Sequence, residues 1–181
     1  MEDRINIICN LTFLFRLNLT TFLLHQYIQD NYRELLNDFL NNLENARDIV
    51  GSDYDRFRSE ALFVRALSYY YLNVLYARTY KLNPQAKSVP LRLGPPETSA
   101  NDLAANTIDE VLNQVLDDVS DAHIAALRNE VNTYNGATHA TQAAAHVLRQ
   151  RVFLEKEDWQ GVVCESSAVN GYELADIRAV F

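Results

Sequence analysis

Residues Glu60–Ala77 read EALFVRALSYYYLNVLYA, and the helix that they predict is apolar on nearly every side. Leu62, Ala66, Tyr69 and Tyr76 share one face of this helix, and Phe63, Leu67, Tyr70, Val74 and Ala77 share another. An all-round apolar helix is normally covered on more than one side. We therefore expect an inner helix of stacked helical hairpins, with its three consecutive tyrosines packed in the core and their hydroxyl groups at polar edges.

A single arginine, Arg65, lies in the middle of this apolar helix. A buried guanidinium is tolerated only where it is paired and hydrogen-bonded, so we expect it to fork onto an acidic side chain of an adjacent helix. Asp118 is the candidate partner. The alternative interpretation is an anion site or an arginine finger, in which Arg65 would meet a ligand.

The composition favours one all-α domain over residues 1–181. A chain of 181 residues is long enough to bury a core, and its 48% hydrophobic content is ordinary for a globular protein. Five glycines and four prolines are few, which favours long helices over many short strands. The approximate helix ranges that we expect are 22–50, 54–78, 107–127, 138–155 and 159–169.

Local signals set the ends of these helices. Asp53 and Thr138 are expected to cap the helices that follow them, and Thr107 with Glu110 predicts a reciprocal capping box. The first helix is expected to bury Leu35, Leu36, Phe39, Leu40 and Leu43. The connection 79–106 contains all four prolines and is long for a compact domain, as functional loops often are.

Charge and motif content exclude several function classes. A formal net charge of −8 with scattered basic residues argues against nucleic acid and against anionic lipid surfaces. There is no glycine-rich phosphate loop and no nucleophile motif. Asp117 and Asp118 are adjacent and point in different directions on a helix, unlike a catalytic carboxylate pair. We therefore expect no enzyme activity and no cofactor.

The histidines and cysteines do not predict a metal site. His139 and His146 lie about two helical turns apart, too far for a two-ligand site, so we expect surface histidines. Cys9 and Cys164 are too few and too distant for a disulfide framework or a zinc site, and we expect two small buried side chains.

The N-terminal region carries no convincing export signal. The apolar stretch from residue 5 to residue 24 is interrupted by asparagines and Arg16, so we expect no transmembrane span. The chain begins with acidic residues, and the residues before Cys9 lack the small side chains expected ahead of a lipid-modified cysteine. We treat residues 1–21 as an uncertain leader.

Two features are candidates for interaction. The connecting segment Thr79–Glu97 offers Tyr80, Lys81, Lys87 and Arg92, although the favoured interpretation is a solvated connector. Trp159, the only tryptophan, could stack on a sugar. The favoured interpretation is that Trp159 packs against Val152 and Phe153 and holds a helical hairpin together.

The order of these motifs resembles the N-terminal helical part of the SusD/RagB family. Glu60, Ala61, Phe63, Arg65, Ala66, Tyr69 and Leu72 match the family pattern E-A-x-F-x-R-A-x-x-Y-x-x-L. Val89-Pro90-Leu91, the segment Thr107–Ala122, GAT at 136–138, Asp158-Trp159 and NGYEL at 170–174 then follow in the family's order. The resemblance covers about residues 22–181.

The resemblance implies a tetratricopeptide-like α-α superhelix of antiparallel hairpins. Members of the family are non-catalytic surface lipoproteins of the Bacteroidetes outer membrane, which bind glycans or other nutrients and cap a SusC-like TonB-dependent transporter. The chain itself shows no signal peptide or lipid-attachment cysteine. It departs from the family in the long segment 76–90, in Ala77, and at Arg149 and Gln150.

Family members are much longer, and this chain stops where their first half stops. The resemblance places most of the ligand site outside the matched region, so the ligand-binding residues are unknown and this chain is expected to bind glycans weakly or not at all. The alternative is a helical-repeat module that binds a peptide or partner protein in its groove.

Overall fold

The computed structural model describes residues 35–94, 104–129 and 139–169 of the chain. Within these ranges the protein is helical and has no β-strand; two isolated bridges pair Lys87 with Thr107 and Arg128 with Thr141. The all-α prediction is therefore confirmed. After a helical stretch at 35–45 the elements are α2 (Arg47–Val50), the 3-10 turn η1 (Gly51–Asp53), α3 (Tyr54–Tyr76), α4 (Ile108–Asp118), α5 (Asp121–Ala126), α6 (Gln142–Glu155) and α7 (Trp159–Ala168).

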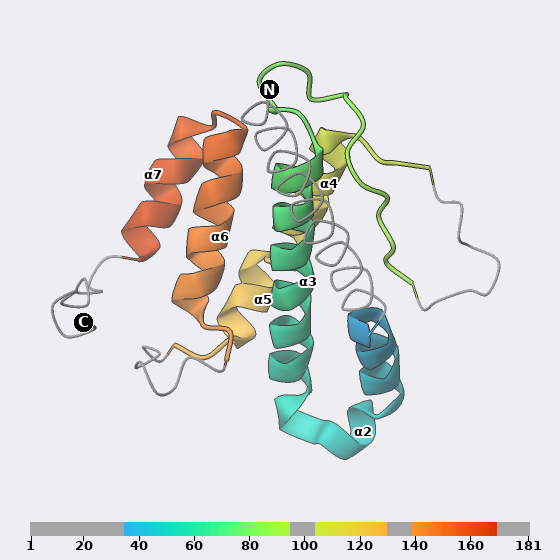
Figure 1. The fold of residues 1–181 in the computed structure, drawn as a ribbon. Helices are drawn as coiled ribbons and strands as arrows, with labels where there is room; N and C mark the ends of the chain where they lie inside the picture. The colour runs from blue at the N-terminus through green and yellow to red at the C-terminus, as the bar shows by residue number, and fades with distance from the viewer. Residues whose placement is uncertain (1–34, 95–103, 130–138, 170–181) are drawn as a thin grey trace, which may run out of the picture.

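Helix α3 runs through the middle of the molecule (Figure 1). The helical stretch 35–45 lies on one side of it and returns to it through α2 and η1. On the other side α6 and α7 lie next to each other as an antiparallel hairpin. Helices α6 and α7 thus form an antiparallel pair of the kind that the hairpin pattern predicts.

The core lies where α3, α4 and α6 meet. Its largest fully buried apolar side chains are Tyr69, Ile108, Leu112, Val111, Val115, Val119 and Val152. Tyr69 satisfies its hydroxyl at the core's edge, where it donates to the carbonyl of Arg92 at 2.8 Å and accepts from the Arg92 amide at 2.7 Å. The expectation for this tyrosine is confirmed.

One face of α3 is not covered in the described structure. Its large apolar side chains are between 36% and 51% exposed, and they are Phe57, Val64, Tyr71, Val74 and Leu75. These positions recur along one side of the helix. The prediction of an all-round buried helix is therefore wrong for this face.

Helix starts follow the predictions where the signal is local. Thr107 and Glu110 form the predicted capping box: Thr107 Oγ1 accepts from the Glu110 amide at 3.2 Å, and Glu110 Oε2 accepts from the Thr107 amide at 2.8 Å. Asp53 caps nothing, and its carboxylate pairs with Arg56 at 3.0 Å instead. The reason is that Asp53 has a near-helical backbone (φ −86°, ψ −5°), whereas a capping residue is extended.

Three helix ranges differ from the predictions. The helix expected over 22–50 is interrupted by a turn at Ala46, before α2 begins at Arg47. The helix expected over 107–127 is broken, because α4 ends at Asp118 and the extended residue Ser120 precedes α5. The helix expected from residue 138 begins at Gln142, where Thr141 Oγ1 accepts from the Ala144 amide at 3.3 Å. The proposed cap Thr138, like the leader 1–21, lies outside the described residues.

We expect Leu112→Ala and Leu148→Ala each to lower the free energy of unfolding by about 2–5 kcal/mol, because each leaves a cavity in a packed core. Their side chains are 0% and 2% exposed. Urea denaturation followed by circular dichroism measures the change. Leu154→Ala is the matched control, since Leu154 also lies on α6 and is 52% exposed. Equal midpoints for Leu148→Ala and Leu154→Ala would contradict the assigned helix face.

Candidate functional site

The predicted pairing of Arg65 with Asp118 is confirmed. The guanidinium donates through Nε to Asp118 Oδ2 at 2.8 Å and through Nη2 to Oδ1 at 2.7 Å, which is a bidentate fork from α3 to α4. Its Nη1 donates to Asn37 Oδ1 at 3.1 Å. Burial lowers the pKa of Arg65, whereas the hydrogen bonds and the charge of Asp118 raise it. The effects of Asp118 together outweigh that of burial, so the pKa of Arg65 is raised. All three nitrogens are occupied internally, which disfavours the anion-site interpretation.

The Arg65–Asp118 pair is the centre of a wider polar network. Asn37 donates to the carbonyl of Arg92 at 2.8 Å, and Gln114 donates to Asp118 Oδ1 at 2.9 Å. The network therefore joins the helical stretch 35–45, α3, α4 and the connection after α3. This explains why Asn37 is buried while Leu35 and Phe39 are exposed, so the predicted apolar face of the first helix is wrong at those positions.

The connection after α3 is bonded to the helices. Tyr80 donates to Asp109 Oδ1 at 2.9 Å, and Lys156 reaches the same oxygen at 2.9 Å. Lys81 pairs with Glu157 at 2.7 Å. The hydrogen bonds from Lys156 and then Tyr80 lower the pKa of Asp109. These bonds favour the interpretation of this segment as a structural connector rather than a free binding loop.

The candidate metal and sulfur residues do not form a site. His139 precedes α6 and lies 3.9 Å from Glu60, whereas His146 on α6 pairs with the buried Glu165 at 2.7 Å. Within the described ranges no three potential ligands come together. The expectation of a buried Cys164 is wrong, because this thiol is exposed, and Cys9 lies outside the described residues.

Trp159 does not hold the α6–α7 hairpin, and that prediction is wrong. Its side chain is 62% exposed. The close approach of the two helices occurs instead at Gly161, where an added Cβ would lie 2.7 Å from Cγ of Phe153. Because glycine brings α7 against Phe153, the tryptophan at the start of α7 is left at the surface. A glycine inside a predicted helix is the sequence signal that could have indicated this contact.

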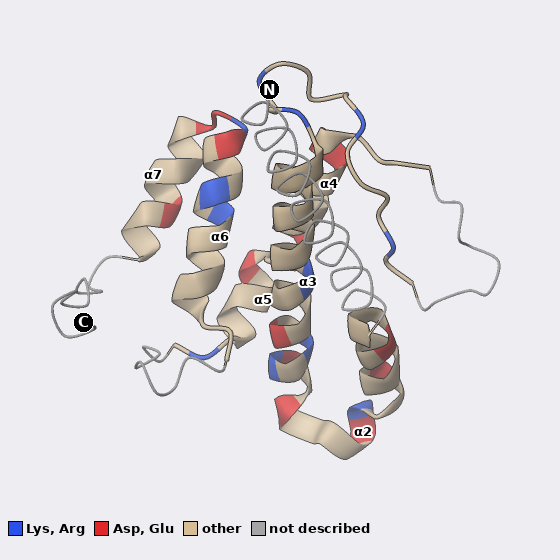
Figure 2. Ribbon diagram, viewed as in Figure 1, with Lys and Arg blue, Asp and Glu red and all other residues tan. Residues whose placement is uncertain are grey.

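Charged side chains are distributed over separate elements (Figure 2). In the described structure lysines and arginines do not gather on one face of the ribbon, and acidic residues lie between them. A phosphate-binding surface needs clustered basic side chains, and these elements do not present such a cluster. No described helix is both long enough and apolar enough to cross a bilayer.

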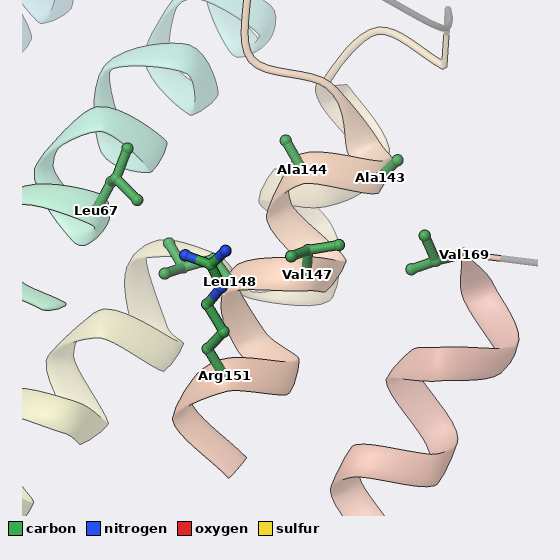
Figure 3. A pocket seen from close by; sticks show the side chains of 7 residues that line it. All are labelled: Leu67, Ala143, Ala144, Val147, Leu148, Arg151 and Val169. Carbon is green, nitrogen blue, oxygen red and sulfur yellow. The ribbon is translucent and has the colours of Figure 1, made fainter. Parts of the chain in front are cut away.

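An apolar pocket lies between α3, α6 and the end of α7 (Figure 3). Its volume is about 370 Å³, and its lining residues are Leu67, Ala143, Ala144, Val147, Leu148, Arg151 and Val169. Figure 3 shows Leu67 on α3 across from the alanines and valine of α6, with Val169 on the far side. Arg151 is the one charged side chain among these lining residues. This pocket suits an apolar group rather than a polar ligand.

Two further pockets include charged side chains in their lining. One, of about 320 Å³, lies beside the Arg65 network and is lined by Asn37, Leu40, Asn41, Glu44, Arg58, Leu62, Arg65 and Leu93. The other, which we name the Glu155 pocket, has a volume of about 220 Å³ and is lined by Asn73, Val74, Ala77, Arg78, Thr79 and Glu155. Burial raises the pKa of Glu155, although a hydrogen bond from Asn73 opposes the shift. The sequence pattern did not single out Glu155 or Asn73 for ligand contact, because the two residues meet only in the folded chain.

We expect Asp118→Ala to lower the free energy of unfolding by about 3–5 kcal/mol, because it leaves the Arg65 charge buried without its partner. Asp117→Ala is the matched control, since Asp117 is the neighbouring residue and is exposed. Urea denaturation at neutral pH compares the two variants. Similar stabilities for Asp117→Ala and Asp118→Ala would show that the fork is not essential to the packing of α3 against α4.

We expect Glu155→Gln to become more stable relative to the parent as the pH rises above 4.5, the ordinary pKa of the carboxyl group. Because burial raises the pKa of Glu155, the folded state holds this proton to a higher pH than the unfolded state, and the parent loses stability as the pH rises through that window. Glutamine does not titrate. Urea midpoints measured from pH 4.5 to pH 7.5 test this, and a constant difference would contradict it.

Comparison with protein families matches residues 24–154 to the SusD-like family, described as "Starch-binding associating with outer membrane". No curated protein matches the chain. Among solved structures, a SusD superfamily protein from Bacteroides fragilis is 46% identical, with a TM-score of 0.73; the match covers 78% of this chain and 33% of that one. A SusD superfamily protein from Bacteroides thetaiotaomicron is 27% identical, with a TM-score of 0.68, and the match covers 78% and 31%.

A laminarin-binding SusD-like protein shares the fold at 24% identity, with a TM-score of 0.59; the match covers 75% of this chain and 27% of that one. The chain spans about a third of the length of the first structures that it matches. The predicted SusD-like helical fold is confirmed by these superpositions. Since the family match covers most of the sequence, the chain belongs to the SusD-like family.

Proposed function

We propose that this chain is part of a non-catalytic glycan-binding component of a nutrient uptake system at the outer membrane. The observation that carries the proposal is the family match over residues 24–154, whose description combines starch binding with association to the outer membrane. That description names binding and no reaction, which supports a binding protein over an enzyme. The name of the laminarin-binding neighbour also supports a glucan as the ligand.

The proposal extends to location and partner. The protein is a surface-exposed lipoprotein of the outer membrane, and it works with a SusC-like TonB-dependent transporter that imports the captured glycan. The family's description supports the membrane association, and the transporter follows from the family resemblance. In this arrangement the helical hairpins form a rigid scaffold, because buried pairs such as Arg65 with Asp118 fix the register of the helices.

A helical-repeat module that binds a partner protein is the second candidate. The apolar pocket and the exposed apolar face of α3 favour it, since an amphipathic helix could lay its apolar side there. The family match favours glycan binding over this alternative. The two candidates make different predictions. Glycan uptake requires a transporter gene next to this gene, and the transporter should copurify with the protein, whereas a protein-binding module requires neither.

The test is copurification from the native cell. The complete gene, tagged at its 3′ end, is expressed in its own host, and outer-membrane proteins are extracted in mild detergent. We expect a TonB-dependent transporter encoded by an adjacent gene to copurify, and the tag to be accessible to protease on intact cells. Recovery of the protein in the soluble fraction without such a transporter would contradict the proposal and support the second candidate.

The isolated chain is expected to bind oligosaccharides weakly, with a Kd of about 1 mM, which corresponds to about 4 kcal/mol. The reason is that the matched region is about a third of its solved relatives, and most of the contacts of a complete site are expected elsewhere. Isothermal titration calorimetry with maltoheptaose and with laminarin oligosaccharides measures the affinity. A micromolar Kd for either sugar would show that this region alone holds a complete site.

A further inference from the structure

The apolar pocket between α3, α6 and the end of α7 presents a lining that favours a cover. Leu67, Val147 and Val169 lie around it, and all of its lining residues except Arg151 are apolar. Covering apolar surface stabilises a protein in proportion to the area that is removed from water. At about 370 Å³ the pocket lies near the lower end of the roughly 300–1,000 Å³ range of ligand sites, so it suits a small apolar occupant.

The described part of the chain ends on the rim of this pocket. Helix α7 ends at Ala168, and Val169, which follows it, is both the last described residue and a lining residue. Figure 3 shows Val169 across from Ala143 and Val147, which belong to the first turns of α6. The residues that follow Val169 in the sequence therefore start next to the pocket, and they are the nearest candidates for its cover.

The residues after Val169 have the composition that such a cover needs. Positions 170–174 read NGYEL, and they lie outside the described residues. Tyr172 and Leu174 alternate with Glu173, so an extended chain would place the two large side chains on the same side. Gly171 gives the backbone before them access to the left-handed turn that commonly follows a helix. The motif thus provides a turn and then two large side chains directly beyond the rim.

The distance that the chain has to cover is short. Tyr172 and Leu174 follow Val169 by three and five residues, which allows roughly 10 Å and 17 Å of extended chain. The axes of packed helices are about 8–10 Å apart, so this length is enough to cross the width of α6. Ala143 and Ala144 line the pocket at the start of α6, and their small side chains allow a crossing backbone to approach this helix closely.

Arg151, the one charged lining residue, also fits this occupant. Its Nη1 donates to the Tyr71 hydroxyl at 3.4 Å, and a guanidinium has five N–H donors, so further donors remain for an acceptor. Tyr172 has a phenolic oxygen that can accept such a bond, and its ring face can attract the guanidinium. Glu173 adds a negative charge to the same short segment. Charge complementarity therefore favours the same occupant as the apolar lining does.

We propose that residues 170–174 cross the start of α6 and cover the apolar pocket, with Tyr172 and Leu174 packed between α3 and α6. The occupant of the pocket is thus a segment of this chain and not a ligand or a second protein. The inference does not depend on the proposed glycan function. It bears on the second candidate, because a covered pocket leaves a partner's helix only the exposed face of α3.

The test is an NMR measurement on the full 181-residue chain with isotopically labelled tyrosine rings and leucine and valine methyl groups. We expect nuclear Overhauser effects between the ring protons of Tyr172 and the methyl groups of Leu67 and Val147. Tyr172→Ala identifies the ring signals, because it removes them from the spectrum. We also expect the methyl signals of Leu67 and Val147 to shift in Tyr172→Ala and in Leu174→Ala, since each variant removes a neighbouring side chain.

The matched control is Ile177→Ala, which removes the same number of carbon atoms as Leu174→Ala from the same part of the sequence and should leave the pocket signals unchanged. Absence of the Overhauser effects, or parent-like pocket signals in Tyr172→Ala, would overturn the proposal and leave the pocket open to a partner. A mixture of labelled and unlabelled chains tests for a second copy. Overhauser effects that occur only between different chains would also overturn the proposal. Copurification with a transporter does not depend on any of these results.

Discussion

The fork of Arg65 onto Asp118 is the constraint on which the arrangement of helices depends. A guanidinium in an apolar helix is stable inside the protein only when its donors are satisfied, and here the two charged side chains are 9% and 4% exposed. The fork fixes the rotation and register of α3 against α4. It also draws Asn37 into the interior, which sets the face that the helical stretch 35–45 turns toward α3.

The same register repeats along α3 at intervals of one turn. Arg65, Tyr69 and Asn73 follow each other at four-residue spacing and are all buried. The first bonds to α4, the second to the backbone of the connection after α3, and the third to Glu155 on α6. One polar ridge thus ties α3 to three different elements. Because Asn73 is the last member of this ridge, the rotation of α3 also decides the geometry of the Glu155 pocket.

The predictions from the sequence were confirmed in two situations. In one, the interacting residues are close in the chain, and in the other, leaving a buried charge unpaired would cost too much free energy. The Thr107 capping box depends on residues three positions apart, and it formed. A buried Arg65 requires an acidic partner, and it forms an ion pair with Asp118. Asp53 failed as a cap because a 3-10 turn precedes α3, and Trp159 failed as a hairpin contact because Gly161 sets the approach of the two helices. The glycan ligand and the transporter rest on family membership, not on side chains in the described structure.

The sequence by itself determined that the chain is helical, where the central helix α3 lies, and that the arginine inside this helix needs a charged partner. Apolar periodicity and the cost of an unpaired charge are properties of the residues and their spacing. Only the tertiary structure decided which face of α3 stays exposed and that Glu155 lies against Asn73 with one oxygen unpaired. These contacts join residues that are far apart in the chain, so they depend on how whole helices pack against one another. A local sequence pattern does not contain this information.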